Sequence, residues 1–300
     1  MRTLIVSAVL LAGCGVSQSE INQGGDARGE DNAELSTSSR TLVALRRDLR
    51  KCASPMCGGY YVHDVNRVHL TETYVSGLDF SSSTLGDHEQ SQILEAADGE
   101  VVLRGKLGPK DSHDIRPFVV TDAWRGMPGA APAAADLVFS VKSITIECFA
   151  APCPSMQSKK GNATTTTNFH QLQTFGLGHF INSSWLQDQV LNNGALVAGT
   201  IAAGTDDNGA TIQVLSATQV FVQLPYEHSA CPVATPASCS SGKVRPYVRG
   251  ANLCLTYQSC MNTGICNYLV PNCGDGYTAF GYTGTNGCGK VECDPTWLNE

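Results

Sequence analysis

The chain has 300 residues, of which 42% are hydrophobic and 16% are charged, and its formal net charge at pH 7 is −7. This length accommodates one large or two modest domains together with a small module. The negative charge opposes binding to nucleic acid, and no run of Lys and Arg overrides it, so no nucleic-acid partner is expected.

Residues 1–14 have the organisation of an export signal. Met1 and Arg2 form a short positive region, and an uncharged, mostly apolar run continues to Ala12. This run is too short to cross a bilayer core, which takes about 20 helical residues, so it indicates a processed leader. The end of the run, Leu11-Ala-Gly-Cys14, resembles the lipobox of bacterial lipoproteins, in which the cysteine is lipidated.

This resemblance implies that Cys14 anchors the mature protein in the bacterial cell envelope, at the periplasmic face of the outer membrane or at the cell surface. The alternative is an ordinary secretory leader with a coincidental cysteine. Residues 15–40 follow with few apolar side chains and no aromatic. Such a segment cannot bury enough apolar surface to offset its ordering entropy, which predicts a disordered tether.

Two stretches of the body, residues 41–127 and 136–225, share a series of features in the same order. The matched pairs are the loops Cys52–Cys57 and Cys148–Cys153, then Asn66 and Asn162, Gly105 and Gly199, and Phe118 and Ile212. The offset is 96 residues for the first two pairs and 94 for the last two. The series predicts two tandem homologous α+β units, joined by the Pro- and Ala-rich residues 128–135. The two glycines are expected at equivalent points of equivalent strands, where a missing side chain permits a bulge or the close approach of another backbone. The two asparagines are expected to cap or turn the local backbone.

Each unit is expected to be rich in strands. Strands are predicted at 60–65, 100–107 paired with 117–124, and 195–203 paired with 211–223. Alternation from Leu137 through Cys148 predicts one long strand with a bulge. Capping-box spacing predicts helices that start at Thr84 and Ser184. Turns are expected at Asp98, Asn193 and Asn208, each followed by glycine.

Residues 226–300 differ in composition, because eight cysteines occur among few aliphatic side chains. Export places the chain where disulfides form, and twelve cysteines remain besides Cys14. We therefore predict a small disulfide-rich module after two α+β units. The cysteines expected in disulfides are Cys52, Cys57, Cys148, Cys153, Cys231, Cys239, Cys254, Cys260, Cys266, Cys273, Cys288 and Cys293. For the loops at Cys52 and Cys148, local disulfides are favoured over a shared zinc ion.

The segment Leu49-Arg-Lys-Cys-Ala-Ser-Pro-Met-Cys-Gly-Gly-Tyr-Tyr-Val-His-Asp-Val-Asn66 and the closing Cys293-Asp-Pro-Thr-Trp-Leu298 resemble a family of uncharacterised myxobacterial lipoproteins. That family has a duplicated domain of unknown function and often a cysteine-rich tail. The resemblance implies export and this architecture. It implies no activity and no catalytic residue.

Other motifs do not assemble a catalytic site. His63 beside Asp64, and His179, are the best acid–base candidates, but neighbours on a strand point to opposite faces. Asp206 to Gly209 resembles the start of a calcium loop without its closing glutamate, so a hairpin is favoured. Gly284 to Lys290 is close to a phosphate-binding loop but lacks its Ser or Thr, which favours a turn. No catalytic residue, metal ligand or cofactor is assigned.

The sequence therefore favours a cell-envelope lipoprotein with a non-enzymatic binding role. It would bind the membrane through its N-terminal lipid and an envelope or extracellular protein or polysaccharide through its body. One alternative is a protease inhibitor that presents the disulfide-closed loops, because a pre-organised loop loses little entropy on binding. The other is an unrecognised extracellular hydrolase.

Overall fold

The computed structural model describes residues 35, 37–67, 72–133, 135–148, 151–174, 177, 180–227, 230–232, 236–266 and 271–298. The leader, Cys14, most of the tether and His179 lie outside these residues. No helix within the described ranges is long and apolar enough to cross a membrane.

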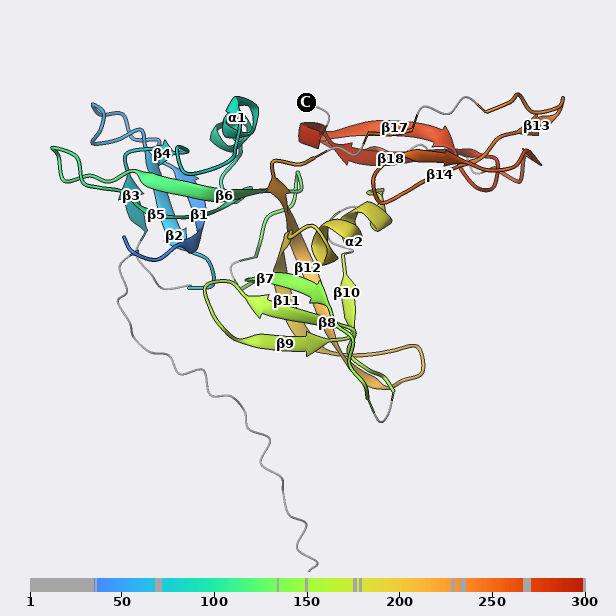
Figure 1. The fold of residues 1–300 in the computed structure, drawn as a ribbon, viewed down its shortest axis with the longest axis horizontal. Coiled ribbons are helices and arrows are strands. Elements are labelled where there is room, and N and C mark those ends of the chain that lie inside the picture. The colour runs from blue at the N-terminus through green and yellow to red at the C-terminus, as the bar shows by residue number, and fades with distance from the viewer. Residues whose placement is uncertain are drawn as a thin grey trace, which may run out of the picture. The chain divides into compact units, whose positions relative to one another are not determined.

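Residues 41–224 form a strand-rich α+β structure in which each half has six strands and one helix (Figure 1). The first half contains β1 (Thr41–Arg47), β2 (Tyr60–Asp64), β3 (Thr73–Val75), β4 (Leu78–Asp79), α1 (Asp87–Glu95), β5 (Val101–Leu107) and β6 (Phe118–Gly126). The second contains β7 (Leu137–Ser143), β8 (Met156–Lys160), β9 (Thr166–Phe169), β10 (Gln171–Gln173), α2 (Ser183–Leu191), β11 (Leu196–Thr205) and β12 (Thr211–Leu224).

All twelve strands belong to one sheet of order β3-β2-β1-β5-β6-β12-β11-β7-β8-β9. The small strands β4 and β10 pair in parallel with β6 and β12, and the ladder along the main order is antiparallel. The second half of the order thus repeats the first in reverse. The two halves meet where β6 pairs with β12, from Gly126 opposite Phe221 to Ala123 opposite Leu224. The two predicted units are therefore joined in one sheet, because their edge strands share a hydrogen-bond ladder.

The predicted glycines lie at irregularities of the two central hairpins. The register of β5 against β6 shifts at Gly105, and that of β11 against β12 shifts at Gly199. A Cβ at Gly199 would lie 2.1 Å from the carbonyl oxygen of Ser216, so only glycine fits this close approach of backbones. Both glycines are therefore in the kind of position that was predicted.

Phe118 begins β6 and Ile212 is the second residue of β12, and these strands pair with β5 and β11 as predicted, but their registers differ by three residues. Phe118 pairs with Leu107, and the residue that pairs with Ile201 is Leu215. The β11–β12 hairpin is longer than its counterpart, so the matching register falls further along β12. Sequence spacing alone does not reveal how an insertion is divided between two strands of a hairpin.

Both helices begin at residues other than those predicted. The N-cap of α1 is Gly86, whose N–H donates to Glu89 Oε2 at 2.8 Å, and Leu85 just before it is buried in the core. The N-cap of α2 is Asn182, whose Oδ1 accepts the N–H of Trp185 at 2.8 Å. The N-caps therefore lie two residues after Thr84 and two residues before Ser184, so the capping-box spacing located each helix start only approximately.

The long bulged strand predicted from Leu137 to Cys148 is shorter in the structure. The strand β7 ends at Ser143, and one further backbone hydrogen bond, from Ile144 N to Ser155 O, extends its pairing with β8. The side chain of Ile146 is 40% exposed, so the alternation there does not reflect burial.

The two faces of the sheet are covered differently. On β1, Val43 packs with α1 in one core, whereas its neighbour Leu42 belongs to a second cluster on the opposite face. That second cluster combines side chains from both halves, among them Trp124 of β6 and Phe221 of β12. The helix α2 covers a third cluster around Trp185. The halves therefore share a hydrophobic core as well as a ladder.

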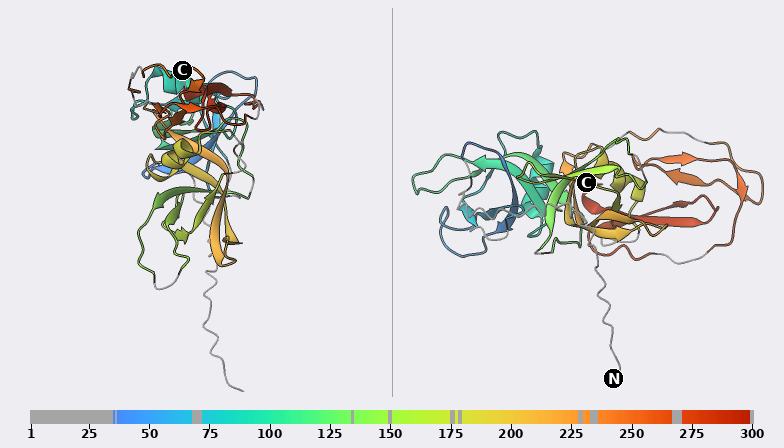
Figure 2. Two further views of the ribbon diagram at one scale, coloured as in Figure 1. Left: turned by 90° about the vertical axis from the view of Figure 1, so that its right-hand side faces the viewer. Right: turned by 90° about the horizontal axis from the view of Figure 1, so that it is seen from below.

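The C-terminal module has three small two-stranded sheets, which can be followed in orange to red in Figure 2. They pair β13 (Lys243–Val244) with β16 (Met261–Asn262), β14 (Tyr247–Arg249) with β15 (Leu255–Tyr257), and β17 (Tyr277–Thr283) with β18 (Gly289–Pro295). A 3-10 helix, η2 (Thr296–Leu298), follows. The predicted disulfide-rich module is thus present.

Disulfides in the module join the first cysteine to the third and the second to the fourth, in two successive groups of four. The bonds are Cys231–Cys254, Cys239–Cys260, Cys266–Cys288 and Cys273–Cys293. The segment that resembled a phosphate-binding loop is a hairpin turn, in which Gly284 N donates to Cys288 O at 2.7 Å. The expected turn is therefore confirmed.

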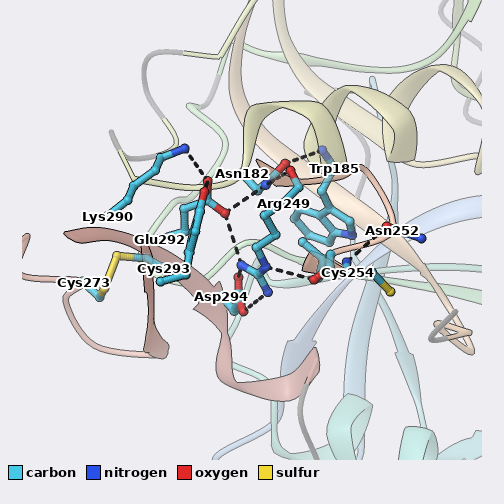
Figure 3. A network of polar contacts seen from close by, with 12 residues as sticks. Asn182, Trp185, Arg249, Asn252, Cys254, Cys273, Lys290, Glu292, Cys293 and Asp294 are labelled. Atoms are coloured by element: carbon cyan, nitrogen blue, oxygen red, sulfur yellow. Dashed lines mark hydrogen bonds and ion pairs between the residues drawn. A yellow bond between two sulfur atoms is a disulfide. The ribbon is translucent and has the colours of Figure 1, made fainter. Parts of the chain in front are cut away.

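A buried ionic network joins the module to the start of α2 (Figure 3). Arg249 of β14 donates to Asp294 Oδ1 at 2.7 Å and to Glu292 Oε2 at 3.3 Å, and Asn182 Nδ2 donates to the same Glu292 oxygen at 2.9 Å. Burial of Glu292 opposes ionisation, but hydrogen bonds from Lys290, Asn182 and Tyr282 outweigh it, so the pKa of Glu292 is lowered. The network anchors the module to the sheet domain.

Candidate binding grooves

Two asparagines fasten each half of the sheet domain to the other. Asn162 accepts the N–H of Leu42 through Oδ1 and donates to the Leu42 carbonyl through Nδ2, both at 2.7 Å. Asn66 makes the same pair of bonds to Val138, at 2.5 and 2.8 Å. Both asparagines have positive φ, 57° and 68°, which asparagine tolerates better than most residues. We call these two pairs of hydrogen bonds the asparagine clasp.

A groove lies beside each asparagine of the clasp. The first, of about 570 Å³, is lined on its polar side by Arg46, His63, Asp64, Glu72 and Asp98. The second, of about 710 Å³, is lined by Lys159 and Lys160 together with residues 39–42, at the start of β1. The strand registers place Asp64 opposite Val43 and Lys160 opposite Phe139, 96 residues further on in both cases. The two grooves thus have matched positions but different charge.

The second groove carries five cationic side chains and one carboxylate. These residues are Arg40, Arg67, Arg104, Lys159 and Lys160, with Asp64 as the acid. Within the described part of the chain, Arg40 and the two lysines have no acidic side chain within 4.0 Å. We call this site the basic groove. A concave surface with one sign of charge concentrates oppositely charged ligands, even on a chain of net negative charge.

Arg104 is held at the wall of the basic groove by its neighbours on the sheet. Its guanidinium lies 4.9 Å from the ring centroid of Trp124 and 3.7 Å from Asp122 Oδ2. Trp124 is itself fixed, because its Nε1 donates to Gly194 O at 2.9 Å. The cation is therefore oriented before any ligand arrives, which lowers the entropic cost of binding.

Asp64 lies at the boundary of the two grooves. Its side chain is 5% exposed, and its Oδ2 pairs with Arg67 Nη1 at 3.3 Å. Its Oδ1 is buried and has no hydrogen-bond partner within the described residues, and the same holds for Thr41 Oγ1 in the basic groove. Burial raises the pKa of Asp64, and the charge of Arg67 opposes this rise. A buried carboxylate oxygen without a partner is costly, which agrees with the raised pKa of this group.

The acid–base candidates from the sequence do not form a pair. His63 and Asp64 both line the first groove, but the described ion pair of Asp64 is with Arg67. No group of three or more His, Cys, Asp or Glu side chains in the described ranges is arranged to hold a metal ion. Asp206 Oδ1 accepts the N–H groups of Asn208 and Ala210 at 2.9 and 2.8 Å, which confirms the predicted hairpin.

The two short cysteine loops are closed by local disulfides, Cys52–Cys57 and Cys148–Cys153. In the first loop, Met56 N donates to Ala53 O at 3.0 Å, so the tip is a tight turn. Tyr74 Oη donates to Pro55 O at 2.8 Å and holds the turn against β3.

Comparison with known proteins assigns the sheet domain to a family. The family model described as Domain of unknown function (DUF6748) matches residues 41–227, and the chain belongs to this family. The match includes both halves of the sheet as one domain and ends where the disulfide-rich module begins. The chain is also similar to an uncharacterized protein of Dictyostelium discoideum, with 26% identity over 261 residues, 83% of this chain and 85% of the relative. No solved structure matches.

Sequence reasoning missed the basic groove. Its five cations are spread from Arg40 to Lys160, and none forms a run longer than two. The sequence feature that came closest to indicating the basic groove was the matched pair Asn66 and Asn162. They were interpreted as local caps or turns, whereas their side chains bind the opposite half of the domain.

Proposed function

We propose that this chain is a non-enzymatic binding protein whose basic groove takes an anionic ligand. The observation that carries the proposal is a groove of about 710 Å³ with three cations, Arg40, Lys159 and Lys160, that have no acidic partner among the residues that the structure describes. This volume is within the range of ligand pockets. Lysine and arginine side chains without internal partners are available for charge-assisted hydrogen bonds to a ligand.

We infer further that the two halves of the sheet domain are duplicated copies. The strand order that reverses on itself, the register shifts at Gly105 and Gly199, and the reciprocal clasp of Asn66 and Asn162 all support duplication. On this view the grooves are also copies. His63 and Asp64 in one stand where Lys159 and Lys160 stand in the other, so the two copies differ in charge at these positions.

The location that we propose is the bacterial cell envelope, with lipidated Cys14 as the anchor. Support comes from the lipobox-like sequence before Cys14 and from twelve further cysteines that pair in disulfides. Disulfides persist in exported proteins. The resemblance to myxobacterial lipoproteins with a cysteine-rich tail agrees with this placement. A groove held outside the membrane would meet anionic envelope or extracellular polymers.

The test measures binding of the full-length chain, kept soluble in detergent, to fluorescently labelled oligogalacturonate, to polyphosphate and to neutral dextran. At least one anionic probe should bind, and dextran should not. The double variant Lys159→Ala with Lys160→Ala should weaken binding by about tenfold or more, since each lost charge-assisted bond contributes measurably. The control, Lys106→Ala with Lys243→Ala, removes two exposed cations outside the groove and should bind as the unchanged protein does. Failure of both anions to bind, or equal losses in the two double variants, would refute the proposal.

A further inference from the structure

The connection between β1 and β2 exposes two large apolar side chains. We call its residues 49–57 the first cysteine loop. Leu49 is 82% exposed and Met56 is 56% exposed. They belong to one tip, because Arg50, next to Leu49, donates through Nη2 to the Met56 carbonyl at 3.3 Å. Exposed apolar side chains that lie together mark contact surfaces for proteins or membranes, whereas scattered single ones are ordinary.

The shape of the first cysteine loop is fixed by contacts within the domain. The Cys52–Cys57 disulfide closes the loop, and the Tyr74 hydroxyl donates to the Pro55 carbonyl at 2.8 Å. A loop that is already ordered loses little conformational entropy when its tip is buried by a partner. The two apolar side chains are therefore presented to solvent on a pre-organised tip.

The charge that this tip presents to solvent is positive. Lys51 is exposed and has no acidic side chain within 4.0 Å among the residues described. Arg50 is paired with Asp48, but the arginine side chain is 55% exposed and the aspartate side chain only 1%. The negative net charge of the whole chain does not cancel this local field, because charges further apart than about 8 Å are largely screened at physiological ionic strength.

The corresponding loop of the second half has different side chains on the same disulfide-closed frame. At the offset of 96 residues, Leu49, Lys51 and Met56 correspond to Thr145, Glu147 and Pro152. The exposed apolar residue of that segment, Ile146, precedes Glu147, whose charge an anionic surface repels. Of the two loops, the first therefore combines exposed Leu and Met side chains with exposed cations, and the second provides a matched control.

From these features we infer that the first cysteine loop is a membrane-contact site, which inserts Leu49 and Met56 between the headgroups of an anionic bilayer. The apolar side chains are stabilised by leaving water, and Arg50 and Lys51 are attracted by the negative lipid surface. A bilayer fits this tip because its interface places anionic groups directly above apolar chains. The site shares no residue with the basic groove, and it is a contact additional to the proposed lipid on Cys14.

The test places a tryptophan reporter in the full-length chain and measures its quenching by brominated phospholipids. The chain is attached to vesicles of brominated phosphatidylcholine, either alone or mixed equally with phosphatidylglycerol. The native tryptophans at 124, 185 and 297 are at most 5% exposed, so lipid quenches them little. In the anionic vesicles, Met56→Trp should be quenched about threefold or more strongly than Ile146→Trp, the matched reporter of the second loop. Both reporters have the same attachment to the vesicle, so their difference does not depend on how the chain is anchored.

Further substitutions in the Met56→Trp chain separate the roles of charge and apolar contact. Lys51→Glu should remove about half or more of the quenching in anionic vesicles, and Leu49→Ser should reduce it in both kinds of vesicle. The control Lys106→Glu, which reverses an exposed cation elsewhere, should leave the quenching unchanged. Equal quenching of the two reporters would overturn the inference and point to a protein partner for the loop. Equal quenching of Met56→Trp in the two kinds of vesicle, or equal effects of the two charge reversals, would overturn the assignment to an anionic bilayer.

Discussion

Replacing Asn162 with glycine should destabilise the whole sheet domain, because this one side chain holds the end of β1 to the opposite half. The variant loses the two 2.7 Å hydrogen bonds to the N–H and carbonyl of Leu42. The carbonyl keeps a second partner, Val65 N at 3.1 Å. Glycine adopts the positive φ of 57° without strain, so no backbone strain is added to the loss of side-chain contacts.

The magnitude follows from the number and environment of these bonds. Each net hydrogen bond contributes about 1 kcal/mol, and a buried donor without its partner costs about 1–3 kcal/mol. We therefore expect Asn162→Gly to lower the free energy of unfolding by about 2–4 kcal/mol. Asn162→Ala should lower it by about 1–2 kcal/mol more, because a Cβ is disfavoured at this φ.

The assay is urea unfolding followed by circular dichroism, with the slope of the transition compared between variants. The control is Asn168→Ala, which removes one exposed side-chain hydrogen bond, 3.0 Å long, to Gln157. It should change the stability by less than about 0.5 kcal/mol. If Asn162→Gly changes it equally little, the clasp does not hold the two halves together.

Four further outcomes follow from the structure. Gly199→Ala should destabilise the β11–β12 hairpin, because its Cβ would lie 2.1 Å from a carbonyl oxygen. Gly77→Ala should not be destabilising, because a Cβ there has no atom within 4 Å, and thermal unfolding distinguishes the two variants. Cys14→Ser should abolish acyl labelling and release the protein from the membrane fraction or leave an uncut precursor, and a membrane-bound product of mature size would contradict the anchor. The folded protein should contain no stoichiometric zinc by metal analysis, and the unfolded, unreduced protein should show no reactive thiol on titration. The pKa of Glu292 is lowered in the folded state, so its ionised form stabilises the fold above the ordinary value of 4.5. This stabilisation is lost as the pH falls through the folded pKa, and Glu292→Gln should flatten this part of the plot of unfolding free energy against pH.

Local signals in the sequence were sufficient for the strand-rich α+β class, the central hairpins, the turns at Asn208 and Gly284, and the cysteine-rich module. These features depend on alternation, turn chemistry and cysteine content, which act over a few residues. The matched positions of Gly105 and Gly199 were also visible, because close backbone approach leaves a glycine in the sequence.

Only the tertiary structure decided how these pieces combine. It placed β6 beside β12, so that the two predicted units form one sheet. It also showed that the residue in register with Phe118 in the other half is Leu215 rather than Ile212. It showed that the side chains of Asn66 and Asn162 bind the backbone of residues 72 and 120 positions away in the sequence. It also gathered Arg40 and Lys160 into one groove. Charges far apart along the chain act together only after folding, because electrostatic interactions depend on distance in space. A local sequence pattern does not contain these distances.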